Sequence, residues 1–283
     1  MTILVTGTLA IDHIAKVADG FQSNDLNGKL HRPKVHWGGC GMNLTYALMR
    51  AGHSALPWVF YGNNCPPGYL QHLQDLAVDQ RAMHKQHDAL CAEAYIFTRE
   101  DTSQLTGFYP GSTRFEAPDA ATLSAIGECS HWIAGPEDDA TLLARLKHIP
   151  TTTTLYWMPG QYVDVTRNNV LQPMLERRPN IVVNETEWQT LIRNVGSETL
   201  DATIDSAFVT LGAKGVRYRQ TAQDQWHEHV TVAANVVDPT GCGDSFCATL
   251  VGDLVAGSHV TQALDHAQRK AALCLGQEGA QRY

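Results

Sequence analysis

The stretch that decides the fold runs over residues 235–246 and reads NVVDPTGCGDSF. Asp238 and Asp244 bracket the glycines Gly241 and Gly243, and the apolar run FCATLVGDLVAG follows. The pattern predicts a glycine turn that enters a helix. The first amides of a helix lack acceptors within it and lie at the positive end of its dipole. A carboxylate there is either an ordinary helix cap or a base beside an anion site, and this stretch alone leaves both interpretations open.

Composition limits the possible classes of protein. The chain has 283 residues, a net charge of -8 and a hydrophobic fraction of 43%, which is enough for a sizeable core. The negative charge argues against a nucleic-acid-binding protein, and no apolar run reaches the ~20 residues that span a bilayer. The N-terminal MTILVTGTLAIDHIA lacks the basic region of a signal peptide and is predicted to be a strand. Seven scattered cysteines without a Cys-x-x-Cys pair predict reduced thiols, so we expect a cytoplasmic protein without membrane or nucleic-acid partners.

Short apolar runs alternate with helical patterns along the chain. The predicted strands are 2–7, 57–62, 131–135, 153–157, 180–184 and 207–211, and the clearest predicted helices are 43–52 and 261–276. Alternation of this kind indicates an α/β fold, in which helices cover both faces of a mainly parallel sheet. With no repeat or linker in the sequence, residues 1–283 are predicted to form one domain.

Two regions interrupt this alternation. Residues 12–37 are polar and rich in turns, and residues 91–113 read as two strands joined by the turn REDTS. We expect them to form a small sheet, which is either a plain hairpin structure or a lid over a reactive site. The segment WHEHV holds His227 and His229, but with no third ligand nearby it is predicted to be an exposed strand rather than a metal site.

Several familiar motifs are absent from the sequence. It contains no Gly-x-x-x-x-Gly-Lys-Ser/Thr, no Gly-x-Gly-x-x-Gly between a strand and a helix, and no Gly-x-Ser-x-Gly. A Walker-type phosphate loop, a dinucleotide-binding enzyme and an α/β-hydrolase are therefore disfavoured. The amides of Gly241, Cys242 and Gly243 are instead predicted to form an anion hole, with Asp244 as a base that takes a proton from an attacking hydroxyl.

Three other motifs favour that interpretation of Asp244. In GGCGMN, residues 38–43, Gly39 allows close approach of a ligand and Asn43 offers a hydrogen bond. In VVNETEW, Asn184 and Glu187 follow a strand where α/β sheets bind ligands, and they suit water around Mg²⁺. In VTLGAKGV, the nucleotide-loop residues are Thr210, Gly212 and Gly215. Each motif alone also fits a tight turn or a helix cap.

The order GGxxxN, NxxE, TxGxxG and DxTGxGD resembles the ribokinase or PfkB carbohydrate-kinase family over nearly the whole chain. The resemblance implies a doubly wound α/β fold with a β-sheet lid, and transfer of the γ-phosphoryl group of ATP to a hydroxymethyl group. It also implies Mg²⁺ and, in many members, a monovalent cation such as K⁺. A homodimer through the lid is common in the family.

The resemblance assigns roles to individual residues. Asp244 matches the family's catalytic base, and Asp12 matches an early aspartate that grips sugar hydroxyls. The remaining matches are Gly241, Cys242 and Gly243 in the anion hole, Gly39 and Asn43 in the sugar motif, Asn184 and Glu187 in the Mg²⁺–phosphate motif, and Thr210, Gly212 and Gly215 in the nucleotide loop. The chain departs from the pattern at Pro239, usually Thr, and at Cys242, usually Ala. Neither change removes the base.

The acceptor is indicated by AYIFTREDTSQLTGFYPGS, residues 94–112, which resembles the lid hairpin of prokaryotic nucleoside and adenosine kinases. Phe108 and Tyr109 would stack on a purine and Gln104 would bond its edge, unless the aromatic side chains only pack the lid. The sequence thus favours an ATP-dependent kinase for the 5′-hydroxyl of adenosine or another purine nucleoside. A PfkB-type sugar kinase and a non-catalytic nucleoside sensor are the alternatives.

Overall fold

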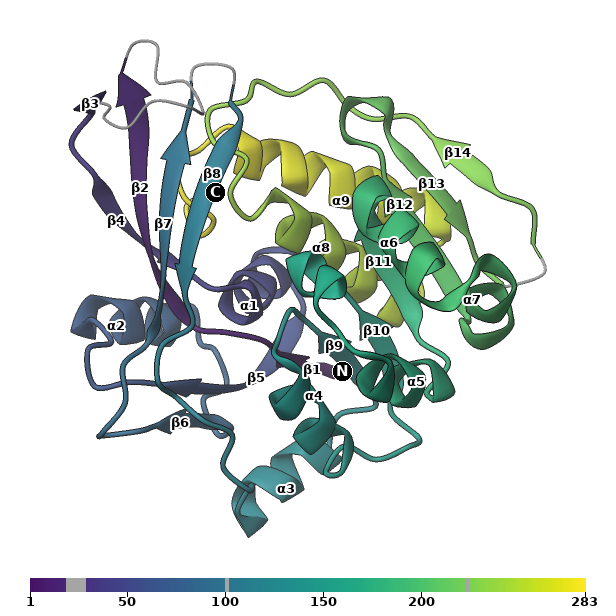
Figure 1. The fold of residues 1–283 in the computed structure, drawn as a ribbon, viewed down its shortest axis with the longest axis horizontal. Helices are drawn as coiled ribbons and strands as arrows, with labels where there is room; N and C mark the ends of the chain where they lie inside the picture. Colours follow the sequence, from purple (N-terminus) through teal and green to yellow (C-terminus); the bar gives the residue numbers. More distant parts are fainter. Residues whose placement is uncertain (19–28, 100–101, 222–223) are drawn as a thin grey trace.

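The computed structural model describes residues 1–18, 29–99, 102–221 and 224–283. Within them, one sheet of nine strands runs through the molecule (Figure 1). From edge to edge its strands are β14 (His227–His229), β13 (Val216–Arg219), β12 (Ser206–Thr210), β11 (Asn180–Asn184), β10 (Thr154–Trp157), β9 (His131–Ala134), β1 (Thr2–Thr6), β5 (Ser54–Tyr61) and β6 (Met83–Lys85). All pairs from β12 to β6 are parallel, and β13 and β14 are added antiparallel.

The strand order reverses at β1. The chain goes from β1 to β5 and β6 on one side of the sheet, and later returns to fill β9 to β12 on the other side. This is the doubly wound arrangement predicted from the sequence. Ligands of such sheets bind beyond the carboxyl ends of the strands, where the order reverses. The residues that follow β1, β9, β10, β11 and β12 are therefore placed to form a site.

Helices cover both faces of the sheet (Figure 1). One face carries α3 (Ala120–Gly127), α4 (Asp139–Leu146), α5 (Asn168–Glu176), α6 (Glu185–Val195) and α7 (Ser197–Thr203); the other carries α1 (Cys40–Arg50), α8 (Cys242–Val255) and α9 (Val260–Leu275). Two short 3₁₀ turns, η1 (Gly160–Asp164) and η2 (Gly212–Lys214), follow β10 and β12, and α2 (Pro67–Asp75) packs near the small sheet.

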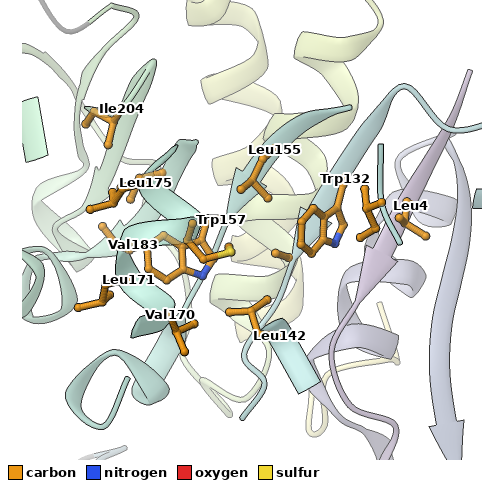
Figure 2. Close-up of a cluster of buried hydrophobic side chains, with 14 of the residues drawn as sticks. Leu4, Trp132, Leu142, Leu155, Trp157, Val170, Leu171, Leu175, Val183 and Ile204 are labelled. Carbon is orange, nitrogen blue, oxygen red and sulfur yellow. The ribbon is translucent and has the colours of Figure 1, made fainter. Parts of the chain in front are cut away.

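The two buried cores follow the alternation of side chains along each strand. In β1, Leu4 belongs to the core under α3 to α7, whereas Ile3 and Val5 belong to the core under α1, α8 and α9. Figure 2 shows the first core, where Trp132 of β9 and Trp157 of β10 lie among aliphatic side chains. Strands buried on both faces explain the nearly continuous apolar runs in the sequence.

A second sheet stands beside the main body (Figure 1). Its order is β3 (Lys29–Leu30), β2 (Ala10–Ala18), β7 (Ala92–Thr98) and β8 (Gln104–Tyr109), and β4 (Lys34–Gly38) pairs with β2. These strands come from the two segments predicted to leave the main domain, 12–37 and 91–113, although residues 19–28 and 100–101 lie outside the described residues. The predicted hairpin in 91–113 is confirmed as β7 and β8.

The predicted elements agree with the structure apart from their ends. Strand β5 begins three residues before the predicted start at Pro57, because Ala55 and Leu56 are buried as well. Helix α1 begins at Cys40 rather than Asn43, directly after Gly39, whose φ of 89° ends the preceding extended segment. The WHEHV segment forms the edge strand β14, as expected, with His227 exposed. Among the described residues, no helix is long and apolar enough to cross a membrane.

Candidate active site

The start of α8 is the centre of the site. Gly241 caps the helix with φ 78° and ψ 2°, and a Cβ at this position would overlap the Cβ of Ala280. Among the described residues, the N–H groups of Gly241, Gly243 and Asp244 donate to no backbone carbonyl, whereas the N–H of Cys242 donates to Pro239 O at 3.2 Å. Three amides without a backbone acceptor therefore lie at the positive end of a 14-residue helix. This arrangement is suited to an anion.

Asp244 is the third residue of α8 and its side chain is buried. Its Oδ2 accepts a hydrogen bond of 2.9 Å from Nδ2 of Asn43 on α1. Burial raises the pKa of Asp244 to about 7; the bond from Asn43 lowers it, and the charge of Glu187 raises it. A carboxylate with such a pKa can accept a proton near neutral pH.

Asp12 is the second buried carboxylate. It lies on β2 at 3% exposure, and its pKa is raised to about 7 by burial and by the charges of Asp244 and Asp238. Gly38 faces it from β4, and a Cβ at Gly38 would overlap its carboxylate. The first glycine of GGCGMN is thus needed to leave room for Asp12.

One cavity of about 460 Å³ joins the two aspartates. It lies between the small sheet and the start of α8, and its size suits a molecule as large as a nucleoside. The predicted acceptor residues that line it are Asp12, Gly39, Asn43, Gln104 and Phe108, together with Asp244 and Gly241.

A second cavity, of about 210 Å³, lies on the other side of Asp244. Asn184 and Glu187 line it with Gly241, Gly243 and Asp244. Asn184 caps α6 through a reciprocal capping box, since its Oδ1 accepts from Glu187 N at 2.9 Å and its N–H donates to Glu187 Oε2 at 3.1 Å. Burial raises the pKa of Glu187. The capping role and the role in the cavity therefore coexist, and carboxylate and amide oxygens are ligands that suit Mg²⁺ and its water.

A third cavity, of about 160 Å³, continues from the second along α8. Thr210, Gly212 and Gly215 line it, with Gln268 of α9 opposite. A Cβ at Gly215 would overlap the carbonyl oxygen of His229, so the loop depends on glycine there. Thr210 and Gly243 line both the second and third cavities, and Asp244 lines both the first and second. The three cavities form a row. Asp244 lies between the 460 Å³ cavity, called the acceptor cavity because the predicted acceptor residues line it, and the other two.

The strand β8 places its predicted side chains on two faces. Gln104, Thr106 and Phe108 line the acceptor cavity. Tyr109 does not follow the prediction: it projects from the opposite face of the strand and is 42% exposed, because successive side chains alternate. Gln104 was predicted to bond the edge of a purine, but its side-chain amide already has protein partners. Its Nε2 donates to Asp238 Oδ1 at 2.9 Å and to Thr240 Oγ1 at 3.1 Å.

Several site residues were missed in the sequence. Cys40, Pro136 and Gln161 line both the acceptor cavity and the second cavity. Pro136 and Gln161 follow β9 and β10, so the rule that singled out Asn184 at the end of β11 would have found them. Gln281, which bonds Asn43 at 3.0 Å, follows α9 and had no signal in the sequence.

The chain matches carbohydrate and nucleoside kinases, so it is a phosphotransferase that uses an alcohol group as acceptor. The chain belongs to the pfkB family of carbohydrate kinases, whose model matches residues 2–282. The ribokinase-like fold expected from the motifs is thereby confirmed.

Individual relatives agree with the family. A nucleoside kinase of Methanocaldococcus jannaschii is 25% identical over 264 residues, covering 90% of this chain and 84% of its own. The structure of Burkholderia thailandensis nucleoside kinase in complex with inosine superposes with a TM-score of 0.86 at 24% identity, covering 100% of this chain and 94% of that one. Its ligand-free form gives 0.76. A ribokinase of Cryptococcus neoformans in complex with ADP gives 0.83 at 19% identity, covering 99% and 95%. At these identities the structures show the shared fold.

Proposed function

We propose that this protein is an ATP-dependent kinase for the 5′-hydroxyl of a nucleoside, with adenosine or another purine nucleoside as acceptor. One observation carries the proposal: Asp244 stands between the 460 Å³ cavity and the cavities that hold the amides without a backbone acceptor and the nucleotide loop. A base in that position has an acceptor hydroxyl on one side and a phosphoryl group on the other. The relatives named as nucleoside kinases support the acceptor class.

In the proposed reaction, Asp12 and Asn43 hold ribose hydroxyls and place the 5′-hydroxyl beside Asp244. Asp244 accepts the hydroxyl proton while the 5′-oxygen forms a bond to the γ-phosphorus of ATP. The bond from that phosphorus to the bridging oxygen breaks, and ADP leaves with the electron pair. The amides of Gly241, Gly243 and Asp244 stabilise charge on the transferred group, while Cys242, whose N–H is already bonded, contributes the helix start.

Asn184 and Glu187 would hold Mg²⁺ through water at the second cavity, where the ion would neutralise phosphate charge. Thr210, Gly212 and Gly215 would lie against the nucleotide. A requirement for a monovalent cation is tested in the same assay by replacing K⁺ with choline.

The first experiment measures ADP release with Mg-ATP against adenosine, inosine, guanosine, cytidine, ribose, fructose and fructose 6-phosphate. We expect a preference for a purine nucleoside. A preference for ribose or fructose would move the assignment to a sugar kinase, with Asp244 in the same role. If folded protein binds adenosine but releases no ADP with any of these acceptors, the non-catalytic nucleoside sensor is favoured.

The second experiment tests the base. Asp244→Asn should lower turnover by about 10² to 10⁴-fold, the usual contribution of general base catalysis, while circular dichroism and ADP binding stay near those of the parent. Turnover close to the parent's would reject Asp244 as the base.

A further inference from the structure

Gln281 lies in the segment that follows α9, and it enters the buried side of the acceptor site. Its Nε2 donates to Oδ1 of Asn43 at 3.0 Å and to the hydroxyl of Tyr69 at 2.9 Å. Asn43 in turn donates through Nδ2 to Asp244 Oδ2 at 2.9 Å. Gln281, Asn43 and Tyr69 are 3%, 5% and 0% exposed, so water does not compete for these bonds.

The polarity of this chain of bonds is set at one end by a backbone carbonyl. The hydroxyl of Tyr69 donates to Gly38 O at 2.7 Å, and a carbonyl oxygen can only accept. Because a hydroxyl has a single hydrogen, Tyr69 must accept from Gln281, which turns the NH₂ group of Gln281 toward both Tyr69 and Asn43. The carbonyl oxygen of Asn43 then faces Gln281, and its NH₂ group faces Asp244. Each amide orientation follows from the one before it.

We propose that Gln281 is a positioning residue for phosphoryl transfer: it holds the side-chain amide of Asn43 in the one orientation that donates a hydrogen bond to Asp244. Gln281 touches neither the acceptor cavity nor the reacting groups, and acts through Asn43. The inference rests on the proposed role of Asp244 as the base.

The orientation matters because the two faces of an amide have opposite effects on a carboxylate. An N–H donor favours the ionised form of Asp244, whereas a carbonyl oxygen in its place would favour the protonated form. The bond from Asn43 already opposes the effect of burial on the pKa of Asp244. Loss of the orientation would therefore leave less of the base ionised at a given pH.

The segment is held in place at several independent points. Gly279 N donates to Asp238 Oδ2 at 2.8 Å, and Glu278 pairs with Lys34 at 2.9 Å on β4. The tail turns back toward the small sheet in Figure 1. Bonds such as the Glu278–Lys34 pair keep the segment docked without touching Asn43, and they provide matched controls.

Asp244 faces other titratable groups that a variant must leave unchanged. They come from the elements packed around the start of α8, namely Asp12 on β2, Cys40 on α1, Glu187 on α6, Asp238 and Cys242 beside the turn, Cys247 on α8, Cys274 on α9 and Tyr283 after α9. Replacing Gln281 with methionine adds no charge near any of them and keeps the volume of the side chain. Gln281→Met removes the two N–H donors and the amide oxygen, and with them the contact of Gln281 with His72.

The test compares the pH dependence of kcat in the parent, in Gln281→Met and in Glu278→Gln, with saturating Mg-ATP and the best acceptor of the panel. In Gln281→Met we expect the acid limb of kcat to move up by about one pH unit, the size expected for a hydrogen bond to a charged group. Glu278→Gln weakens the pairing with Lys34 and with the buried His36, which loosens the docking of the segment, and it should leave the limb in place. An unchanged limb in Gln281→Met, or an equal shift in Glu278→Gln, would overturn the positioning role.

A double-mutant cycle separates this inference from a general loss of packing. In an Asn43→Leu background the amide that carries the effect is gone, so Gln281→Met should cause no further shift of the limb. An additional shift there would show that Gln281 does not act through Asn43. Asp244→Asn is measured alongside. If that variant keeps its turnover, Asp244 is not the base. If Asp244→Asn is inactive but the acid limb of Gln281→Met does not move, only the positioning role of Gln281 is rejected.

Discussion

At the scale of the residue, the site combines two buried carboxylates whose pKa values are both raised to about 7. The usual pKa of an aspartate is 3.8. Because the folded state favours the protonated forms, their contribution to stability is fully present below pH 3.8 and is lost as the pH rises through 7. Above that pH, the ionised carboxylates of Asp12 and Asp244 lower the free energy of unfolding of the free protein.

Asp12→Asn tests how much the ionised carboxylate of Asp12 lowers the free energy of unfolding. The variant removes one buried charge, so the free energy of unfolding should rise relative to the parent by up to about 4 kcal/mol at pH 8 and by little at pH 4. Urea unfolding at both pH values measures the difference. The acceptor KM should rise at the same time, since Asp12 is proposed to hold ribose hydroxyls. A gain in stability of the same size at both pH values would contradict the raised pKa of Asp12.

At the scale of the element, the start of α8 contains two glycines with different reasons to be glycine. Gly241 has φ 78° and its missing Cβ leaves room for Ala280. Gly243 has no neighbour within 4 Å of the position that a Cβ would take, and it lines the second and third cavities. The fold requires glycine at 241, whereas a Cβ at 243 would meet only open space beside the cavities.

The matched pair Gly241→Ala and Gly243→Ala separates these reasons. Gly241→Ala should lower the free energy of unfolding by about 1 to 3 kcal/mol, because of strain at positive φ and overpacking. Gly243→Ala should keep or gain up to about 1 kcal/mol of stability through helix propensity, yet lose at least tenfold in kcat/KM for ATP. Thermal unfolding and steady-state kinetics measure both. Normal kinetics in stable Gly243→Ala would remove Gly243 from the phosphate site.

The strand β8 contacts the helix start through Gln104, which joins the small sheet to Asp238 and Thr240. If these bonds hold the sheet closed, Gln104→Met should lower kcat/KM for all nucleosides by a similar factor and leave their ranking unchanged. Phe108→Ala, on the cavity wall, should change the ranking. Kinetics on adenosine, inosine and cytidine measure both variants. A changed ranking in Gln104→Met alone would restore the role of Gln104 as a reader of the base.

At the scale of the whole molecule, the outer face of the small sheet exposes large side chains. Tyr95, Leu105 and Tyr109 are 43%, 54% and 42% exposed on β7 and β8. A homodimer through this sheet stays a prediction. Leu105→Glu should then weaken the dimer at least tenfold, since charge is depleted in interface cores. Sedimentation velocity over a range of concentrations measures it. A parent chain that sediments as a monomer at every concentration would contradict the prediction.

The fold was predictable because its strands are buried on both faces. Continuous apolar runs such as 180–184, separated by amphipathic helices, have few solutions other than a mainly parallel sheet covered by helices. Glycine turns were also informative about the site, because local geometry requires glycine there. The glycines at 39, 215 and 241 have positive φ and no room for a Cβ. These constraints act over a few residues and are visible in the order of the letters.

The sequence by itself therefore determined the class of fold, the start of α8 with Asp244, and the strand ends beside which the cavities lie. Only the tertiary structure decided which side chains share a space and which are already bonded. In the folded chain, the N–H of Cys242 donates to Pro239 O and the side-chain amide of Gln104 donates to Asp238. Tyr109 lies on the face of β8 opposite the acceptor cavity. The fold also brings Gln281 to Asn43, 238 positions apart in the chain. Hydrogen bonds between residues so far apart in the chain depend on how the helices and strands pack. The separation of two residues in the sequence does not predict their distance in the folded protein.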